Sequence, residues 1–360
     1  MTREYKDLLL GQILLEKGPV ALMEVCGTHT MAIAKSGIKN LLPANIKLLS
    51  GPGCPVCVTA QSDIDQVIAL TKEPGVVLTT FGDMIRVPGS ASSLQSEKAQ
   101  GADVRVVYSP RDAIQLAEET PNKEIIFLGI GFETTAPVVA ATIEEAAERG
   151  INNFSVWSLH KIVPPALKAI LADPEIQFDG LICPGHVSAV IGAEVYELLA
   201  EEYQKPCVIT GFETTDILEG IYMLIKQVGM GRHQVENQYQ RVVKPQGNLV
   251  AKKLLEEVFT TKDARWRGLG NIPASGLALN DKYENYDARK RFRIPEFEER
   301  EIKGCSCGDI LKGKLSPLQC QLFGRACTPA RPIGPCMVSS EGACAAHYRY
   351  HPAGGDKYEK

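Results

Sequence analysis

The sequence predicts an α/β protein: two doubly wound parallel-sheet lobes around a cleft, plus a small cysteine-rich domain. Short apolar runs alternate with longer amphipathic stretches over residues 46–216, which is typical of parallel sheets covered by helices on both faces. Six of the eleven cysteines fall between Cys305 and Cys344, in a segment with few large apolar residues for a hydrophobic core.

The expected strands are four to seven residues long, are mostly β-branched or aromatic, and end in Gly, Pro or Ser. They cover residues 46–50, 75–81, 104–109, 124–130, 153–159, 180–185 and 206–211. Helical patterns lie between them, for example at 62–73 and 136–150. The pentapeptide GFETT, at 131–135 and again at 211–215, follows a strand and opens a helix in both copies. This repetition predicts two similar lobes.

Three domains are expected. Residues 1–137 form lobe I, residues 138–235 form lobe II, and residues 236–360 form a C-terminal cluster domain. The stretches 235–248 and 266–277 are expected to be loop-rich. The dense charge run at 282–304 is expected to be a solvated linker and surface.

Composition excludes several classes of protein. The formal net charge of -4 leaves no basic surplus to neutralise phosphates, so we expect no nucleic-acid partner. No apolar run approaches the ~18 residues that span a bilayer, and the N-terminus does not resemble a signal peptide. We therefore expect a cytoplasmic protein without a membrane role. In that reducing compartment, clustered cysteines favour metal binding or redox chemistry over disulfides.

The C-terminal cysteines have the spacing C-x-C-x12-C-x6-C-x8-C-x7-C. Zinc and iron–sulfur clusters both accept four cysteines, but structural zinc usually uses C-x2-4-C pairs, which this segment lacks. A four-cysteine cluster leaves two thiols over. If Cys305 and Cys307 lie on extended chain they point the same way, so one could ligate a cluster while the other stands beside it. The spare thiols either exchange electrons with the cluster or are merely buried.

Two N-terminal motifs carry the remaining candidate thiols. EVCGTHT places Cys26 before Gly, Thr and His, which is equally typical of a Thr-capped helix start with a packed histidine. GPGCPVC puts Cys54 and Cys57 within reach of one metal or of each other, and a following helix would lower their pKa values. Cys26 lies before the first expected strand and the dithiol just after it, so we expect their sulfurs at one sheet edge, within roughly 10 Å.

Other residues favour structural interpretations. GPGCPVC lacks the Gly-Lys-Ser/Thr of a P-loop, and Thr134 stands where a dinucleotide fingerprint needs its third Gly. His160 and His186 lie at strand ends, where histidines are more often structural than ligands. Cys183 and Cys207 lie inside expected strands and are expected to be inert core residues.

Taken together, these motifs closely resemble the HypD family of iron–sulfur proteins that mature [NiFe]-hydrogenases. The resemblance rests on EVCGTHT, GPGCPVC, GFETTAP, PGHVS, GCSCGDIL, FGRACTP and GPCMVSSEGACAAHYRY, in order along nearly the whole chain. It implies a scaffold for an Fe(CN)2CO unit that works with a small HypC-type chaperone. It also implies that a HypE-type protein donates cyanide made from carbamoyl groups supplied by HypF. The implied fold has a cluster domain similar to ferredoxin:thioredoxin reductase.

The resemblance also implies roles for individual residues. Cys26 would hold the iron, Cys54 and Cys57 would form the cleft dithiol, and Cys307 and Cys336 would form a redox pair. The implied [4Fe–4S] ligands are Cys305, Cys320, Cys327 and Cys344. The residues expected to hydrogen-bond the diatomic ligands are Thr28, His29, Glu133, Thr135 and His186.

These roles describe an assembly scaffold with redox chemistry, whose status as an enzyme the sequence leaves open. The alternatives are a stand-alone, cluster-dependent thiol–disulfide oxidoreductase and a zinc-stabilised interaction module.

Overall fold

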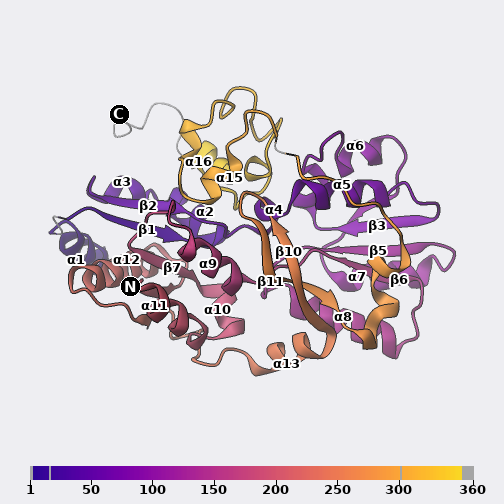
Figure 1. Ribbon diagram of the computed structural model, residues 1–360, viewed down its shortest axis with the longest axis horizontal. Coiled ribbons are helices and arrows are strands. Elements are labelled where there is room, and N and C mark those ends of the chain that lie inside the picture. The colour runs from indigo at the N-terminus through magenta and orange to yellow at the C-terminus, as the bar shows by residue number, and fades with distance from the viewer. Residues whose placement is uncertain (1–2, 16–17, 301, 351–360) are drawn as a thin grey trace.

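The computed structural model describes residues 3–15, 18–300 and 302–350. It confirms the mixed α/β class, with two parallel sheets and a cysteine-rich C-terminal segment (Figure 1). Within these described ranges, no helix is both long and apolar enough to cross a membrane.

The first sheet has five parallel strands in the order β2-β1-β7-β8-β9. They are β1 (Val20–Glu24), β2 (Ile46–Ser50), β7 (Gly180–Pro184), β8 (Cys207–Thr210) and β9 (Val235–Asn237). The accompanying helices are α1 (Arg3–Ile13), α2 (Gly27–Ser36), α3 (Ile38–Leu41), α10 (Gly185–Ile191), η2 (Glu194–Tyr196), α11 (Glu197–Tyr203) and α12 (Thr214–Gly229). The strand residues Leu22, Ile182 and Val208 are fully buried. They pack in one core with apolar side chains of α1 and α12.

The second sheet has four parallel strands in the order β4-β3-β5-β6. They are β3 (Val76–Thr80), β4 (Val104–Val106), β5 (Glu124–Gly129) and β6 (Phe154–Ser158). The accompanying helices are α4 (Pro55–Val58), α5 (Gln61–Leu70), η1 (Gly82–Arg86), α6 (Leu94–Ala99), α7 (Pro110–Glu119), α8 (Ala136–Glu148) and α9 (Val163–Ala172). Val77, Ile125 and Phe127 pack with α7 and α8, as the β-branched pattern predicts.

The division of the chain between the sheets differs from the expected one. β1 and β2 pair with strands that follow residue 180, while β3 to β6 form the other sheet between them. A boundary at residue 137 therefore does not separate the two sheets. The reason is that β1 pairs with both β2 and β7, so the first sheet is completed only when the chain returns from the second.

Residues 249–291 are more ordered than their loop-like composition predicts. They form α13 (Leu249–Val258), an antiparallel hairpin of β10 (Phe259–Trp266) and β11 (Gly270–Leu279), η3 (Asp281–Tyr286) and α14 (Ala288–Arg291). The expectation of a loop at 266–277 was wrong, since its glycines and proline lie in a hairpin whose inner side chains are buried. Figure 1 shows this hairpin between the two sheets.

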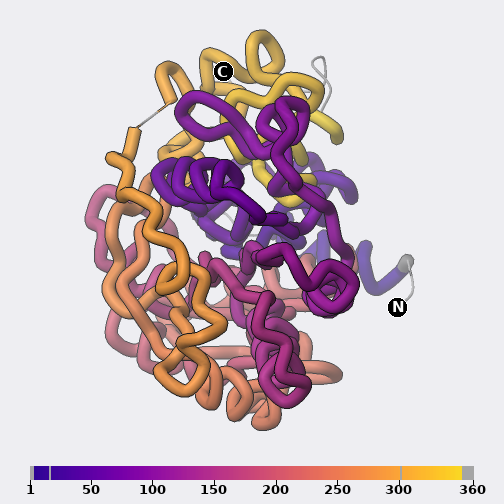
Figure 2. The backbone as a smooth tube through the Cα atoms, turned by 90° about the vertical axis from the view of Figure 1, so that its right-hand side faces the viewer, coloured from indigo at the N-terminus to yellow at the C-terminus, as the bar shows by residue number. Residues whose placement is uncertain are grey.

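The C-terminal segment, residues 302–350, contains only short helices. They are α15 (Cys307–Leu311), η4 (Pro317–Gln319), η5 (Pro335–Met337) and α16 (Ala343–Tyr350). Its buried cysteines and Met337 belong to one continuous apolar cluster that also includes Met23 and Val25 beside β1 and Leu78 in β3. In Figure 2 the segment lies against the indigo and purple N-terminal part of the chain.

Candidate functional site

Three motif loops meet at the carboxyl edge of the first sheet. Cys26 follows β1, Cys54 follows β2 and His186 follows β7. The strand order reverses between β1 and β7, and ligands of open α/β sheets bind outside the carboxyl ends of strands at such a switch point. Because β1 was not predicted from the sequence, Cys26 was expected before the first strand. It instead occupies the loop after one.

Cys26 is buried at the start of α2, where its backbone is extended. Burial raises the pKa of its thiol to about 12, with further raising by the carboxylates of Glu24 and Glu341. Hydrogen bonds from the backbone N–H groups of His29 and Thr28 act in the opposite direction. The thiol is therefore protonated near neutral pH, and a bound cation would have to displace its proton.

The loop that carries the dithiol packs directly on the Cys26 loop. Gly27 donates its backbone N–H to the carbonyl oxygen of Gly53, at 2.9 Å. A Cβ atom on Gly53 would lie 2.1 Å from the backbone nitrogen of Cys26, so only glycine permits this approach. Cys54 is the next residue. The two loops thus meet as the sequence predicts, while the 10 Å separation of the sulfurs stays a prediction.

Cys54 and Cys57 face each other across the single turn of α4. Their sulfurs are 2.6 Å apart, and the N–H of Cys57 donates to the Cys54 sulfur at 3.3 Å. Burial raises the pKa of Cys57 well above its usual value, and neighbouring Cys336 and Cys54 raise it further. The expected lowering by a helix N-terminus does not occur at Cys57, because one helical turn does not offset complete burial.

Two predicted histidines belong to one aromatic stack. Phe212 lies between the rings of His29 and His186, with centroid separations of 4.6 Å and 3.9 Å. Burial lowers the pKa of His29 to about 4, so its ring is neutral at physiological pH. The Nε2 atom of His29 lies 2.9 Å from the carbonyl oxygen of Gly211, to which it donates. Its Nδ1 atom is buried and has no hydrogen-bond partner among the described residues.

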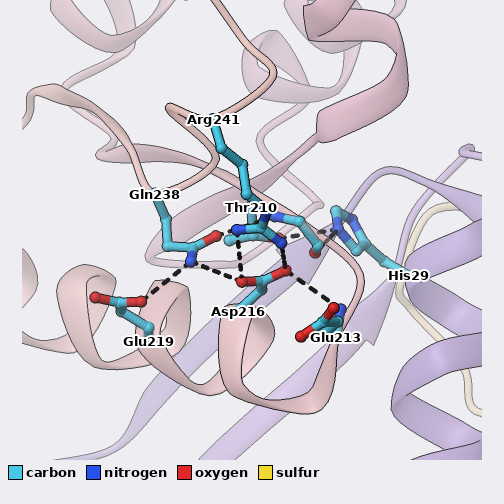
Figure 3. Close-up of polar contacts among 8 residues, drawn as sticks. His29, Thr210, Glu213, Asp216, Glu219, Gln238 and Arg241 are labelled. Carbon is cyan, nitrogen blue, oxygen red and sulfur yellow. Dashed lines mark hydrogen bonds and ion pairs between the residues drawn. The ribbon is translucent and has the colours of Figure 1, made fainter. Parts of the chain in front are cut away.

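A polar network fixes the loop under this stack (Figure 3). Asp216, at the start of α12, accepts hydrogen bonds from Arg241 and Gln238. Gln238 in turn accepts the backbone N–H of Gly211 at 3.1 Å. His29 is joined to the network through Thr210, whose hydroxyl oxygen is 2.9 Å from Nε2. The loop between β8 and α12 is therefore held rigidly beneath the two histidines.

Glu24 and Glu341 also surround Cys26, and sequence analysis did not single them out. The Glu24 carboxylate accepts the N–H of Cys26 at 3.1 Å, and burial raises its pKa to about 7. Glu341 comes from the C-terminal segment and accepts the hydroxyl of Thr28 at 2.7 Å. Both lie inside motifs that were recognised, EVCGTHT and SSEGAC. The sequence signal that could have identified Glu24 and Glu341 is the presence of an acidic residue within a few positions of a motif cysteine.

The other two predicted polar residues follow β5 of the second sheet. Glu133 is buried after β5 and accepts the N–H of Val163 at 2.8 Å, and burial raises its pKa to about 7. Thr135 donates its hydroxyl to the carbonyl of Phe132. No described hydrogen bond joins either side chain to Cys26. Thr28 and His29 thus follow the thiol directly on α2, and Phe212 joins His186 to His29, while the roles of Glu133 and Thr135 stay a prediction.

The C-terminal segment holds a small cavity, here called the thiol cavity, between its short helices. Apolar side chains of Ile310, Leu322, Phe323 and Met337 close it. Its five cysteines are Cys305, Cys307, Cys320, Cys327 and Cys344. All four residues expected to ligate a cluster are among them. Cys305 and Cys307 are not on extended chain as supposed, since Cys307 begins α15, yet both sulfurs face Gly334.

The donor set of the thiol cavity suits an iron–sulfur cluster. Thiolates are the usual ligands of such clusters, and the N–H of Ile333 already points at the Cys327 sulfur, at 3.3 Å. The described part of the chain contains no three His, Cys, Asp or Glu side chains grouped as ligands of one metal ion. The five thiols are instead spread around an apolar space, and a four-iron cluster takes one cysteine per iron. The residues present therefore fit the group that the resemblance implies.

The two sets of thiols are connected. Cys336, in η5, follows Pro335, whose carbonyl oxygen lies 4.0 Å from the Cys57 sulfur, and its pKa responds to both Cys57 and Cys307. Cys307 in turn affects the pKa values of Cys305 and Cys344, and the sulfurs of Cys305 and Cys307 both face Gly334. We call Cys54, Cys57, Cys336 and Cys307 the thiol series. It leads from the dithiol to the thiol cavity, of which Cys307 is a lining residue.

Cys336 differs from its neighbours in acidity. Hydrogen bonds from Cys307 and Cys57 lower its pKa to about 6, against the effect of burial. A lowered pKa favours the thiolate at Cys336, and a thiolate is the nucleophile in disulfide exchange. Cys183 and Cys207, by contrast, are fully buried in β7 and β8, as expected of core residues.

Comparison with known proteins gives consistent results. The family described as "HypD: Hydrogenase formation hypA family" matches residues 8–351. The chain is 48% identical over 340 residues to hydrogenase maturation factor HypD2 of Bradyrhizobium diazoefficiens, covering 92% of this chain and 90% of that one. It is 45% identical over 333 residues to hydrogenase maturation factor HypD of Escherichia coli, covering 92% and 89%. A putative hydrogenase expression/formation protein of Methanocaldococcus jannaschii is 45% identical over 329 residues, covering 91% of each chain.

Proposed function

The chain belongs to the HypD family of hydrogenase-formation proteins, and we propose that it acts as the scaffold on which an Fe(CN)2CO unit for [NiFe]-hydrogenases is assembled. In this proposal Cys26 holds the iron that is being built, and the thiol series delivers electrons to the same place. The observation that carries the proposal is the position of Cys336, which follows the Pro335 carbonyl beside Cys57 and whose acidity depends on both Cys57 and Cys307. This position of Cys336 provides one path for thiol–disulfide exchange between cysteines that are far apart in the sequence.

The exchange needs no oxidant or reductant beyond the thiols themselves. The Cys336 thiolate attacks the Cys57 sulfur of a Cys54–Cys57 disulfide, forming a Cys336–Cys57 bond and releasing Cys54 as a thiolate. Cys307 then attacks Cys336, which releases Cys57 and leaves a Cys307–Cys336 disulfide. Two electrons have moved to the N-terminal pair. Cys54 and Cys57 take up two protons, since burial favours the neutral thiol at Cys57.

The residues proposed to hold a [4Fe–4S] cluster are Cys305, Cys320, Cys327 and Cys344. Such a cluster would supply single electrons to reduce the Cys307–Cys336 disulfide. Burial raises the pKa of Cys327, and hydrogen bonding from Cys307 raises that of Cys344. Cluster assembly at these thiols would therefore release protons and depend on pH.

The surroundings of Cys26 support its role toward iron. Soft thiolates suit low-valent iron that carries cyanide and carbon monoxide. The unpartnered Nδ1 atom of His29 offers an acceptor, and His186 is exposed at the same edge. We further propose that a small HypC-type chaperone supplies a second thiolate to the iron, and that a HypE-type protein delivers cyanide.

Replacing Cys336 with Ser tests the exchange path. The variant should retain iron in the C-terminal segment, yet a Cys54–Cys57 disulfide should no longer be reduced when the cluster is reduced chemically. Cys183→Ser is the matched control, because it removes an equally buried thiol outside the series. The measurement is mass-spectrometric counting of alkylated thiols after anaerobic reduction. Full reduction of Cys54 and Cys57 in the Cys336 variant would refute the path.

A further inference from the structure

A second cavity, unrelated to the cysteines, lies at the carboxyl edge of the second sheet. Residues that follow β6 line it together with α5, β10 and α14, and its volume is about 130 Å³. A cavity of about 150 Å³ holds a benzene-sized molecule, so this one fits a small ligand. The carboxyl edge of parallel strands is also where α/β proteins bind ligands.

Positive side chains dominate this cavity, which we call the cationic cavity. Its four cations are Lys161, Lys262, Arg265 and Arg289. Only two carboxylates, Asp63 and Asp263, line it as well. The surplus of two positive charges matches a dianion.

The two lysines form no direct ion pair in the described part of the chain, although Asp63 acts on both at longer range. Neither Lys161 nor Lys262 has a carboxylate oxygen within 4 Å among the described ion pairs. Lys161 is 2% exposed and donates only to the carbonyl oxygen of Arg265, at 2.7 Å, while its ammonium group lies over Trp266. A buried ammonium group with a single neutral acceptor retains unused donors.

Arg289 is likewise incompletely paired. Its closest carboxylate contact is with Asp63, at 3.5 Å, it donates to the Gln66 side chain at 3.1 Å, and its guanidinium carbon lies 4.4 Å from the centre of the Trp157 ring. Its Nε atom is buried and has no hydrogen-bond partner among the described residues. Burial lowers the pKa of Lys161 and of Lys262 to about 8 each; Arg289 acts in the same direction and Asp63 in the opposite one. An anion in the cavity would give Lys161, Lys262 and Arg289 further negative charge and further hydrogen-bond acceptors.

His160 adds an acceptor to this set of donors. Ser158 donates its hydroxyl to the carbonyl of Leu277, at 2.8 Å, so its oxygen must accept from Nδ1 of His160, at 3.1 Å. Burial and then Lys262 lower the pKa of His160 to about 3, which keeps the ring neutral. Its Nε2 atom therefore carries a lone pair, and that atom is buried without a partner among the described residues.

We propose that the cationic cavity binds inorganic phosphate as the hydrogen phosphate dianion. Lys161, Lys262 and Arg289 donate to its oxygens, and Nε2 of His160 accepts its proton. Sulfate has the same shape and charge but no proton, and the dianion of a phosphomonoester has none either. The acceptor at His160 thus selects free hydrogen phosphate over both. This site is independent of the role proposed for Cys26.

Calorimetric titration of the full chain tests the proposal with three probes: inorganic phosphate, sulfate and phenyl phosphate. The titrations are run at a pH where phosphate is mainly the dianion. Phosphate should bind most tightly. Lys262→Met should weaken phosphate binding roughly 10- to 100-fold, the range for hydrogen bonds to charged groups. Lys253→Met, on the exposed face of α13, should leave it unchanged.

His160→Phe provides a second readout that does not depend on charge. It should weaken phosphate to the level of sulfate while leaving sulfate binding as in the parent, and thermal melting checks that each variant folds. Absence of phosphate binding to the parent chain would overturn the proposal. Equal weakening by the Lys262 and Lys253 variants, or equal binding of sulfate and phosphate to the parent, would overturn it too.

Discussion

The loop that carries the dithiol and the segment that holds the thiol cavity differ in what holds their cysteines in place. Cys54 stands at the edge of a sheet, next to strands whose Leu22 and Met23 are fully buried. Cys320 and Cys327 stand in a segment whose described residues, 302–350, contain no strand and only short helices. The first region takes its interior mainly from apolar strand residues. The second has cysteines as a large part of its interior, so we expect its stability to depend more strongly on them.

The largest expected effect follows from removing a thiol from the C-terminal segment. Cys320→Ala should abolish iron binding and destabilise the segment by about 4 kcal/mol or more, the range for loss of a metal site. Hydrogen exchange of residues 302–350 and iron content measure both effects. Cys183→Ala, in the apolar interior of β7, should change neither. Full iron in the Cys320 variant would show that the comparison between the two regions is wrong.

At the sheet edge that carries Cys26, we expect a thiol replacement to remove a bound group without destabilising the fold. Cys26→Ala should abolish the infrared CN and CO bands of the complex with the small chaperone, because the iron loses its thiolate. The cluster and the fold should persist, since the sheet does not depend on this side chain. Cys207→Ala is the matched control. Retention of all bands would move the iron to Cys54 or Cys57, and their absence from the parent complex would favour a stand-alone thiol–disulfide oxidoreductase.

Within the sheet lobes, a buried charge limits stability. Burial raises the pKa of Glu133 from 4.5 to about 7, so the folded state prefers the neutral carboxyl. The free-energy cost of ionising this buried carboxyl is absent below pH 4.5. It develops between pH 4.5 and 7 and is fully present above pH 7. Glu133→Gln should therefore raise the free energy of unfolding by up to about 3 kcal/mol at alkaline pH and by nothing in acid.

Urea unfolding across that pH range provides the measurement for Glu133. Glu202→Gln, on the exposed surface of α11, should give no stabilisation at alkaline pH. If the Glu133 variant gained the same stability at every pH, ionisation of this group would not be the cause.

The smallest effect is expected at the contact between the two regions. Thr28→Val removes the hydroxyl that Glu341 accepts but keeps the side-chain shape. We expect local opening of residues 339–341 to become easier by about 1 kcal/mol, the net contribution of one hydrogen bond. Native-state hydrogen exchange near Gly342 measures this opening. Thr30→Val, which removes a hydroxyl facing Glu24 instead, should leave that exchange unchanged.

Local patterns predicted most of the strands, because β-branched runs such as VVLTT and EIIFLG are unambiguous. The run VALME was missed since it is short and holds only one β-branched residue. The pairing of β1 with β7 could not be predicted at all, because pairing depends on contacts more than 150 residues apart. The β10–β11 hairpin was obscured by glycines and a proline near its turn.

The candidate site shows the same limit. Motif resemblance located every cysteine of the thiol series, and the structure brings those residues together. Glu24 and Glu341 were overlooked because an acidic residue gives no spacing signal of its own. The sequence could not show that Glu133 and Thr135 follow a strand of the other sheet, since that depends on the strand order.

The interleaved strand order also has a consequence for synthesis. β2 ends at Ser50, but its sheet gains no further strand until β7 begins at Gly180, about 130 residues later. At roughly 5–20 residues per second the ribosome needs on the order of ten seconds to cover that distance. Throughout this interval Cys26, Cys54 and Cys57 are attached to an unfinished sheet, open to oxidants and stray metals. The burial that the folded chain gives these three thiols is therefore complete only after β7 has been made.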